Sequence, residues 1–307
     1  MMVAWVALLV AGSGPATPAE RVDPRAAALA CTSGEPEDAE ASDPEGALVS
    51  MPTLRHVVTP ESGEVTAAVV PAAELVVPGE SPCPDGMVHV SGEYCTEVKH
   101  QCKDWLDDPK LPYARCGEYE PVARCVGQRI GMSFCIDRLE HTAPGDDLPL
   151  NFQSFVTGSK VCRQQGKRLC TEREWNFACE GEEMRPYPYG WKREPKCNQD
   201  RDDLYELKRT KRGRKQVLRD HRAVASSFPE CVSPFGVLNM VGNLDEPVLR
   251  EVAKYNPPFR NGLKGGWWMA GRNRCRPATT AHDDYYRDIQ VGVRCCADLP
   301  GLPGASG

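Results

Sequence analysis

The sequence predicts one disulfide-rich folded domain, with short strands, few helices and frequent turns, that follows a long acidic segment. Three observations predict it. Fifteen cysteines occur in 307 residues, and all except Cys31 lie between Cys83 and Cys296. Residues 32–82 are rich in Glu, Asp, Pro, Ala and Ser and have few aromatics. Beyond them, periodic stretches are short and are separated by turn signals.

The cysteine content indicates an oxidising compartment. A cytosolic protein keeps its thiols reduced, and the chain has no CxxC…CxxC or CxxH pattern that would suit a zinc site. Fourteen cysteines remain in the predicted domain, an even number that permits seven disulfides. The sequence leaves their pairing open.

The amino terminus is similar to a secretory leader. Val3 to Ala11 form an apolar run that is too short to span a bilayer. We therefore expect residues 1–31 to be a signal-peptide-like segment, with cleavage near Ala16 or Ala19 and no transmembrane span. A lipid anchor at Cys31 is the alternative. Either form predicts a protein that is secreted, periplasmic or associated with the cell envelope.

Composition also places the domain boundaries. Residues 32–82 bury too little apolar surface to order themselves, so we expect a disordered acidic linker, although its aliphatic patches could pair as short strands. The folded domain is expected at 83–300 and a flexible tail at 301–307. The net charge of −6 argues against a general nucleic-acid binder.

Within the predicted domain, four stretches have patterns that indicate local structure. Residues 87–95 predict a short strand that ends at a Ser-Gly turn. Residues 95–131 form a cysteine-rich excursion with little periodicity, and 133–142 alternate as a strand does. The apolar residues of 152–162 recur near helical spacing, which predicts a helix there.

The stretch around Trp175 predicts a helix most clearly. Thr171 and Glu174 match the S/T-x-x-E capping box, and Gly181 stands where a glycine ends a helix. We expect Trp175 to lie in the core rather than at a functional site, since large apolar side chains are mostly buried.

A run of Lys and Arg occupies residues 207–222. It has two interpretations. The run could bind an acidic ligand such as a polysaccharide or a phosphate, or it is a solvated surface loop, which is the commoner case.

An ordered set of motifs runs from Met87 to Asp298. It comprises MVHVSGEYC, FCIDRLEHT, CRQQGKRLCTEREWNFACEG, YPYGW, CNQD, SSFPECVSPFGVLNMVGNLDE, KGGWW and VGVRCCAD. In this order the motifs resemble the formylglycine-generating enzyme family, also called the sulfatase-modifying factor domain. The resemblance implies an α+β domain with a C-type-lectin-like fold and much irregular chain. The family includes oxidases that convert a sulfatase cysteine to formylglycine with copper and oxygen, and domains that only bind.

The resemblance also implies a structural calcium site in the loop MVGNLDEP. Asn243 and Glu246 stand at the matching side-chain positions, Val241 and Leu244 would supply carbonyl oxygens, and Asn198 stands where a second site begins. Oxygen ligands of this kind suit calcium. The alternative is that Asn243 and Glu246 only shape and cap a turn.

Copper chemistry in this family needs two nearby thiolates, because copper(I) prefers soft ligands. Matched to the family, the chain has Ala270 at the first position and Cys275 at the second. We therefore expect no copper site, and Cys275 as half of a disulfide. The alternative is a catalytic Cys275 whose thiolate is stabilised by neighbouring arginines, with Cys295 or Cys296 as the nearest second thiol in the sequence.

A binding role uses the same carboxyl-terminal segment differently. Aromatic faces and a few polar groups would form a shallow pocket for a peptide, a glycan or an envelope protein. The expected ligand-binding residues are Trp267, Trp268, Arg274, Arg276, His282, Asp284 and Tyr286. The alternative for the two tryptophans is the core. We expect a non-catalytic binding module, with the formylglycine-generating oxidase as the alternative.

Overall fold

The computed structural model describes residues 81–111, 113–251, 259–271 and 273–299. The expected signal segment, the linker up to residue 80 and the tail 301–307 lie outside the described residues. In the part that is described, no helix is both long and apolar enough to cross a membrane.

Strands outnumber helices in the described part, and most of them are short. The elements in chain order are β1 (Met87–Cys95), β2 (Val98–Lys99), β3 (Cys102–Trp105), β4 (Cys116–Tyr119), β5 (Arg124–Cys125), β6 (Arg129–Asp137), α1 (Phe155–Gln164), β7 (Arg168–Leu169), α2 (Glu172–Glu180), β8 (Tyr205–Thr210), β9 (Gly213–Leu218), β10 (Glu246–Leu249), β11 (Asn261–Lys264), β12 (Ala278–Thr279) and β13 (Cys295–Ala297).

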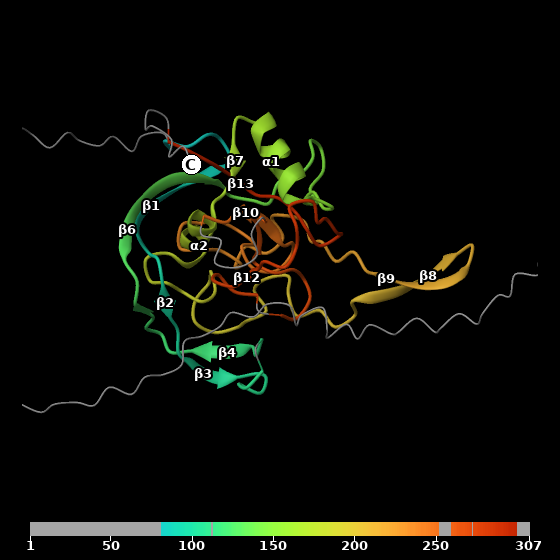
Figure 1. The fold of residues 1–307 in the computed structure, drawn as a ribbon, viewed down its shortest axis with the longest axis horizontal. Helices are drawn as coiled ribbons and strands as arrows, with labels where there is room; N and C mark the ends of the chain where they lie inside the picture. The colour runs from blue at the N-terminus through green and yellow to red at the C-terminus, as the bar shows by residue number, and fades with distance from the viewer. Residues whose placement is uncertain (1–80, 112, 252–258, 272, 300–307) are drawn as a thin grey trace, which may run out of the picture.

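The main sheet is antiparallel, with the strand order β1-β6-β13-β7. Strands β1 and β6 pair over their whole length, from Met87 opposite Asp137 to Cys95 opposite Arg129, and form a long curved ribbon (Figure 1). The expected strand at 87–95 is confirmed. The turn expected at its Ser-Gly pair is wrong, because Gly92 stays in the strand and pairs with Met132.

Helix α2 lies inside the curve of β1 and β6, where it forms the centre of the core (Figure 1). Its expected caps are confirmed. The Thr171 hydroxyl accepts a hydrogen bond from the Glu174 amide at 3.2 Å, and the Glu174 carboxylate accepts one from the Thr171 amide at 2.8 Å. Gly181 ends the helix at a φ of +67°. Trp175 is fully buried, as expected.

Helix α1 confirms the helix expected near 152–162, with a shifted start. Ser154 is the N-cap, and its side chain accepts a hydrogen bond from the Thr157 amide at 3.1 Å. Phe152 lies outside the helix, with a φ of +53° and an exposed fraction of 51%. The helix therefore begins where its first turn is capped, and buries Phe155 instead.

Seven disulfides join all fourteen cysteines between Cys83 and Cys296, which confirms the disulfide-rich fold. The pairs are Cys83–Cys135, Cys95–Cys125, Cys102–Cys116, Cys162–Cys295, Cys170–Cys296, Cys179–Cys275 and Cys197–Cys231. One of them joins α1 to strand β13 of the main sheet, and another joins α2 to the irregular segment that carries Cys275. Together with the two helices and the short strands, they make an α+β fold with much irregular chain.

The basic run at residues 207–222 is not the irregular loop that the sequence favoured, because most of it is paired as strands. It contains an antiparallel hairpin, with Tyr205 opposite Leu218 and Thr210 opposite Gly213, closed by Lys211 and Arg212. Its polar sequence hides the strand pattern, because neither face of this hairpin has a continuous apolar row. In Figure 1 the hairpin projects from the body of the domain.

Candidate functional site

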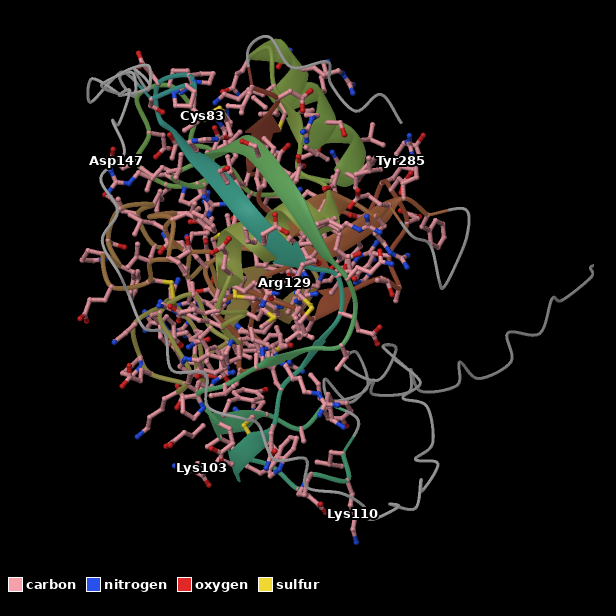
Figure 2. All side chains as sticks on the ribbon, turned by 90° about the vertical axis from the view of Figure 1, so that its left-hand side faces the viewer. Cys83, Lys103, Lys110, Arg129, Asp147 and Tyr285 are labelled. Atoms are coloured by element: carbon pink, nitrogen blue, oxygen red, sulfur yellow. A yellow bond between two sulfur atoms is a disulfide. The ribbon has the colours of Figure 1, made fainter. Side chains whose placement is uncertain are left out.

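A hollow of about 480 Å³ lies beside the loop that precedes β13. It collects aromatic side chains from a short stretch of chain. The residues that line it are Phe259, Ala281, His282, Asp283, Tyr285, Tyr286 and Arg287. Tyr285 is 74% exposed and points outward. It lies far from the cysteine-rich β3–β4 hairpin that carries Lys103 (Figure 2).

Asp284 holds this loop against the rest of the domain. Its carboxylate accepts hydrogen bonds from the backbone amides of Arg260 and Asn261, at 2.9 and 3.0 Å, and from the Arg260 guanidinium at 3.1 Å. Its backbone carbonyl accepts one from the Val156 amide at the start of α1, at 3.2 Å. Asp284 thus positions the hollow, and its carboxylate is occupied by these contacts.

His282 and Tyr286 form a stacked pair inside the hollow. Their ring centroids are 3.6 Å apart and the planes differ by 11°. The Tyr286 hydroxyl accepts a hydrogen bond from the Gln290 amide at 2.9 Å. Burial lowers the pKa of His282 and raises the pKa of Tyr286, so both rings are uncharged near neutral pH. An uncharged stacked pair beside an exposed tyrosine suits a ligand with a flat apolar face.

A larger hollow of about 630 Å³ lies between His141 and the end of α1. Its wall includes exposed Asp146 and Asp147 and the helix residues Val161 and Gln165, and His141 is the only aromatic ring in it. Sites for sugars and peptides commonly offer aromatic rings on which the ligand stacks. The hollow at His282 has several such rings and is therefore the better candidate.

The two tryptophans of the expected ligand set lie away from the hollow's wall. Trp268 is fully buried and meets the half-buried Trp267 edge to face, with centroids 5.3 Å apart. The guanidinium of Arg274 lies 5.9 Å from the centroid of the Tyr119 ring. Trp268 is therefore a core residue, which was the alternative to its expected ligand-binding role, and its buried ring has no free face for a ligand.

Arg276 is held entirely by the protein. Its guanidinium pairs with the Glu180 carboxylate and also donates to the Tyr94 hydroxyl at 3.1 Å and to the carbonyls of Cys95 and Thr96, at 2.7 and 3.3 Å. Every N–H of the side chain is directed at one of these acceptors. Arg276 thus ties α2 to β1, and of the expected ligand set only His282, Asp284 and Tyr286 gather at the hollow.

Cys275 forms a disulfide with Cys179 of α2, which agrees with the expected disulfide role. The residue is fully buried, whereas Ala270 is exposed. Cys295 and Cys296, expected as the nearest second thiols, are bonded to cysteines of α1 and of the segment before α2. The side chains present do not fit a copper(I) ion, since none of these sulfurs is a free thiolate.

The expected calcium ligand Glu246 is part of a buried ion pair. Its carboxylate lies 2.8 Å from the Arg294 guanidinium and accepts a hydrogen bond from the Trp175 indole at 2.6 Å. Asn243 accepts from the Asn198 amide at 2.9 Å. A calcium ion on Glu246 would have to compete with a guanidinium that is itself fully buried, so Glu246 does not fit the role of main ligand.

The same loop contacts Glu140, which the sequence analysis did not single out. One carboxylate oxygen of Glu140 accepts from the Asn243 and Asn239 amides, at 2.7 and 3.2 Å. The other has no hydrogen-bond partner among the described residues, and the side chain is buried. Burial, and then the charge of Glu246, raise the pKa of Glu140 to about 8. Its place in the motif FCIDRLEHT was the available signal.

Val241 and Leu244, the expected carbonyl donors, are also buried in this loop. Near this loop, the buried side-chain oxygens without a hydrogen-bond partner among the described residues include one carboxylate oxygen of Glu140 and the amide oxygen of Asn239. Carboxylate and amide oxygens are ligands that calcium takes.

Comparison with known proteins identifies the domain. Residues 117–299 match the family model described as the sulfatase-modifying factor enzyme 1-like domain. The uncharacterized protein YfmG of Bacillus subtilis (strain 168) is 27% identical over 178 residues, which are 50% of this chain and 37% of YfmG. The chain thus matches little more than a third of that relative's length.

Comparison with solved structures gives matches at low sequence identity. CarF is 13% identical, with a TM-score of 0.44 over 70% of this chain and 99% of CarF. Treponema denticola variable protein 1 is 11% identical, with a TM-score of 0.38 over 69% of this chain and 94% of that protein.

Proposed function

The chain belongs to the family of sulfatase-modifying factor domains, with the C-type-lectin-like α+β fold of that family, and we propose that it is a non-catalytic binding module. The observation that carries the proposal is the state of the cysteines. All fourteen in the domain are paired, including Cys275. A fold hosts a reaction only when the reacting groups are in place.

The oxidase alternative lacks its thiolate pair in this arrangement. Ala270 replaces one sulfur of the family's pair, and the other candidate, Cys275, is bonded to Cys179 and fully buried. A substrate cysteine would need both a reduced thiol and a path to it. These two obstacles favour binding over oxidation.

The proposed ligand-binding site is the hollow at His282 and Tyr286. Tyr285 and the stacked pair offer aromatic surface, while exposed Asp283 and Arg287 offer charges of both signs at its rim. Aromatic surface with a few polar groups suits a glycan or a peptide. The ligand would stack on the tyrosines and take hydrogen bonds from the rim.

Seven disulfides fit an oxidising, extracytoplasmic compartment. We further propose that residues 1–31 direct secretion, with a secreted, periplasmic or envelope-anchored product, and that residues 32–82 act as a linker for the domain at 83–300.

Thiol chemistry tests the choice between binding and oxidation. One sample of the native protein is treated with an alkylating reagent, and a second, untreated sample is incubated with copper(I), oxygen and a peptide that carries the sulfatase cysteine motif. We expect no label on Cys275 and no aldehyde on the peptide. A labelled Cys275 together with an aldehyde would establish the oxidase, with Cys179 rather than Cys295 or Cys296 as the second thiol.

Substitution in the hollow tests the binding site. The wild-type protein and the variant Tyr285→Ala/Tyr286→Ala are screened on a glycan array and a peptide library. The expected result is binding by the wild type that weakens about tenfold in the variant, because the stacking surface is lost. Trp105→Ala, which removes an exposed aromatic ring from strand β3, outside both the hollow and the basic hairpin, is the control. Equal weakening in the control would contradict the proposed site.

We also propose that a calcium ion binds beside the 241–246 loop and is held by the carboxylate of Glu140. Oxygen ligands around a carboxylate suit calcium, and a bound ion stabilises the folded state. A chelator should then lower the melting temperature of the wild type and leave that of Glu140→Gln unchanged. No effect of the chelator on the wild type would exclude the site.

A further inference from the structure

The β8–β9 hairpin concentrates exposed positive charge around its turn. Its strands have six residues each, so it extends about 20 Å. We call residues Tyr205–Leu218 the arm. Six cations lie around its tip, all of them exposed: Lys208, Arg209, Lys211, Arg212, Arg214 and Lys215. The whole chain carries a net charge of −6, so the arm has the opposite sign to the protein.

Strand register places like charges opposite each other in the arm. Lys208 pairs with Lys215, and Arg209 pairs with Arg214. Directly opposed side chains lie about 4.5–5.5 Å apart at Cβ, which is shorter than the screening length of about 8 Å at physiological salt. Like charges at this distance destabilise a two-stranded ribbon. A bound anion between them would turn this repulsion into attraction.

The nearest acids neutralise only one of these six cations among the described residues. Glu206 pairs with Lys208 at 3.0 Å, and at the base of the arm Asp203 pairs with Arg219 at 2.9 Å. Among the described residues, no ion pair involves the other five cations of the tip, which are Arg209, Lys211, Arg212, Arg214 and Lys215. The acids thus fix the base, and the positive charge of the tip is left available.

We propose that the arm binds a linear acidic polysaccharide, at a surface distinct from the His282 hollow. The cations occupy both faces of the ribbon and its turn, as the alternation along β8 and β9 requires. An extended polyanion can follow such a surface around its edge. Guanidinium groups such as those of Arg209 and Arg214 match sulfate and carboxylate oxygens in a bidentate geometry.

Two other polyanions fit the arm less well. A membrane is flat and meets one face only, and Lys211 and Arg212 leave the tip without an apolar side chain to insert. Single-stranded nucleic acid binds on aromatic platforms, whereas Tyr205 is the one aromatic ring of the arm. The seven disulfides also fit a compartment where acidic glycans occur.

The test uses the full chain with heparin and polygalacturonate, which are sulfated and carboxylated glycans. Binding is measured for the wild type, for Arg209→Gln/Arg214→Gln, and for Lys110→Gln/Arg124→Gln, which removes two exposed cations from other loops and strands. We expect the arm variant to bind at least one of the two glycans about tenfold more weakly, and the control to bind as the wild type does. Affinity should fall as salt rises, because counterions are released on binding.

Parallel measurements use vesicles of phosphatidylcholine with phosphatidylglycerol, oligothymidylate, and a peptide of the chain's own acidic residues 33–46. The proposal is overturned if the arm variant binds both glycans as tightly as the wild type, or if any of these three probes binds the arm more tightly than the glycans do. Glycan binding by the arm should persist in Tyr285→Ala/Tyr286→Ala. Failure of the hollow as a site would therefore not affect this result.

Discussion

The β1–β6 pair and the β8–β9 pair are both antiparallel ribbons, but opposite kinds of side chain face each other across them. In β1–β6, Val90 lies opposite Phe134, and both are buried. In β8–β9, Arg209 lies opposite Arg214, and both are exposed. One ribbon is stabilised by burial, disulfides and helix α2, while the other has none of these at its tip.

The difference separates stability from binding in this domain. Changes in the body should alter the free energy of unfolding, whereas changes at the arm's tip should alter binding and leave unfolding nearly unchanged. The predictions below test this separation, from the largest expected effect to the smallest.

The largest loss is expected for Glu246→Gln. The substitution leaves the guanidinium of Arg294 buried without its counter-charge, which costs about 3–5 kcal/mol. Urea unfolding of the variant and the wild type gives the difference. Glu97→Gln, at an exposed carboxylate, is the control and should change the unfolding free energy by less than about 0.5 kcal/mol. A Glu246→Gln variant as stable as the control would contradict the role of the ion pair.

Removal of a long-range disulfide should cost nearly as much. Replacing Cys197 and Cys231 by Ser opens a loop of 34 residues that no other disulfide closes, and we expect a loss of about 2–4 kcal/mol. Replacing Cys102 and Cys116, which are 14 residues apart, should cost about 1 kcal/mol less than that, because the loop-closure entropy is smaller. Thermal unfolding of the two variants measures the contrast. Equal losses would show that strain or local packing outweighs the chain entropy.

Stability should also fall as the pH rises from the ordinary carboxyl range to about 8. Burial, and then the charge of Glu246, raise the pKa of both Glu140 and Asp245 to about 8. The folded state therefore keeps protons that the unfolded state has lost, so this stability is full below pH 4 and is lost through pH 8. Structural relaxation and water penetration reduce this pH-dependent change in unfolding free energy. We expect it to be smaller than the losses predicted for Glu246→Gln and for removal of a disulfide.

Unfolding by urea across this pH range, with a chelator present so that no cation is bound at Glu140, measures the slope. Glu140→Gln and Asp245→Asn should each flatten it, whereas Asp146→Asn, at an exposed carboxylate, should not. A slope that is the same in all three variants would assign the pH dependence to other groups.

The smallest effect is expected at the arm. Arg209→Gln/Arg214→Gln removes a like-charge pair from exposed strands, so the unfolding free energy should stay constant or rise by less than about 1 kcal/mol. Thermal unfolding of this variant also shows that lost glycan binding does not come from misfolding. A clear loss of stability would mean that the two arginines support the fold, and the contrast between body and arm would disappear.

Local sequence determined the elements that depend on neighbouring residues. The caps of α2 at Thr171 and Glu174 were predictable, because a capping box joins residues only three positions apart. The strand at 87–95 and the disulfide content followed from alternation and from the cysteine count. The ordered motifs also identified the family, since each retains several residues in a fixed order.

Only the tertiary structure decided which residues meet across the chain. Cys275 pairs with Cys179 across 96 residues, and such pairing depends on the distance between Cβ atoms in the fold rather than on spacing in the sequence. For the same reason the sequence did not reveal two buried ion pairs. Arg276, expected to contact a ligand, pairs with Glu180, and Glu246, expected to bind calcium, pairs with Arg294. A charged side chain looks the same in the sequence whether it faces a ligand or a buried counter-charge, because only the packing around it determines which of the two it contacts.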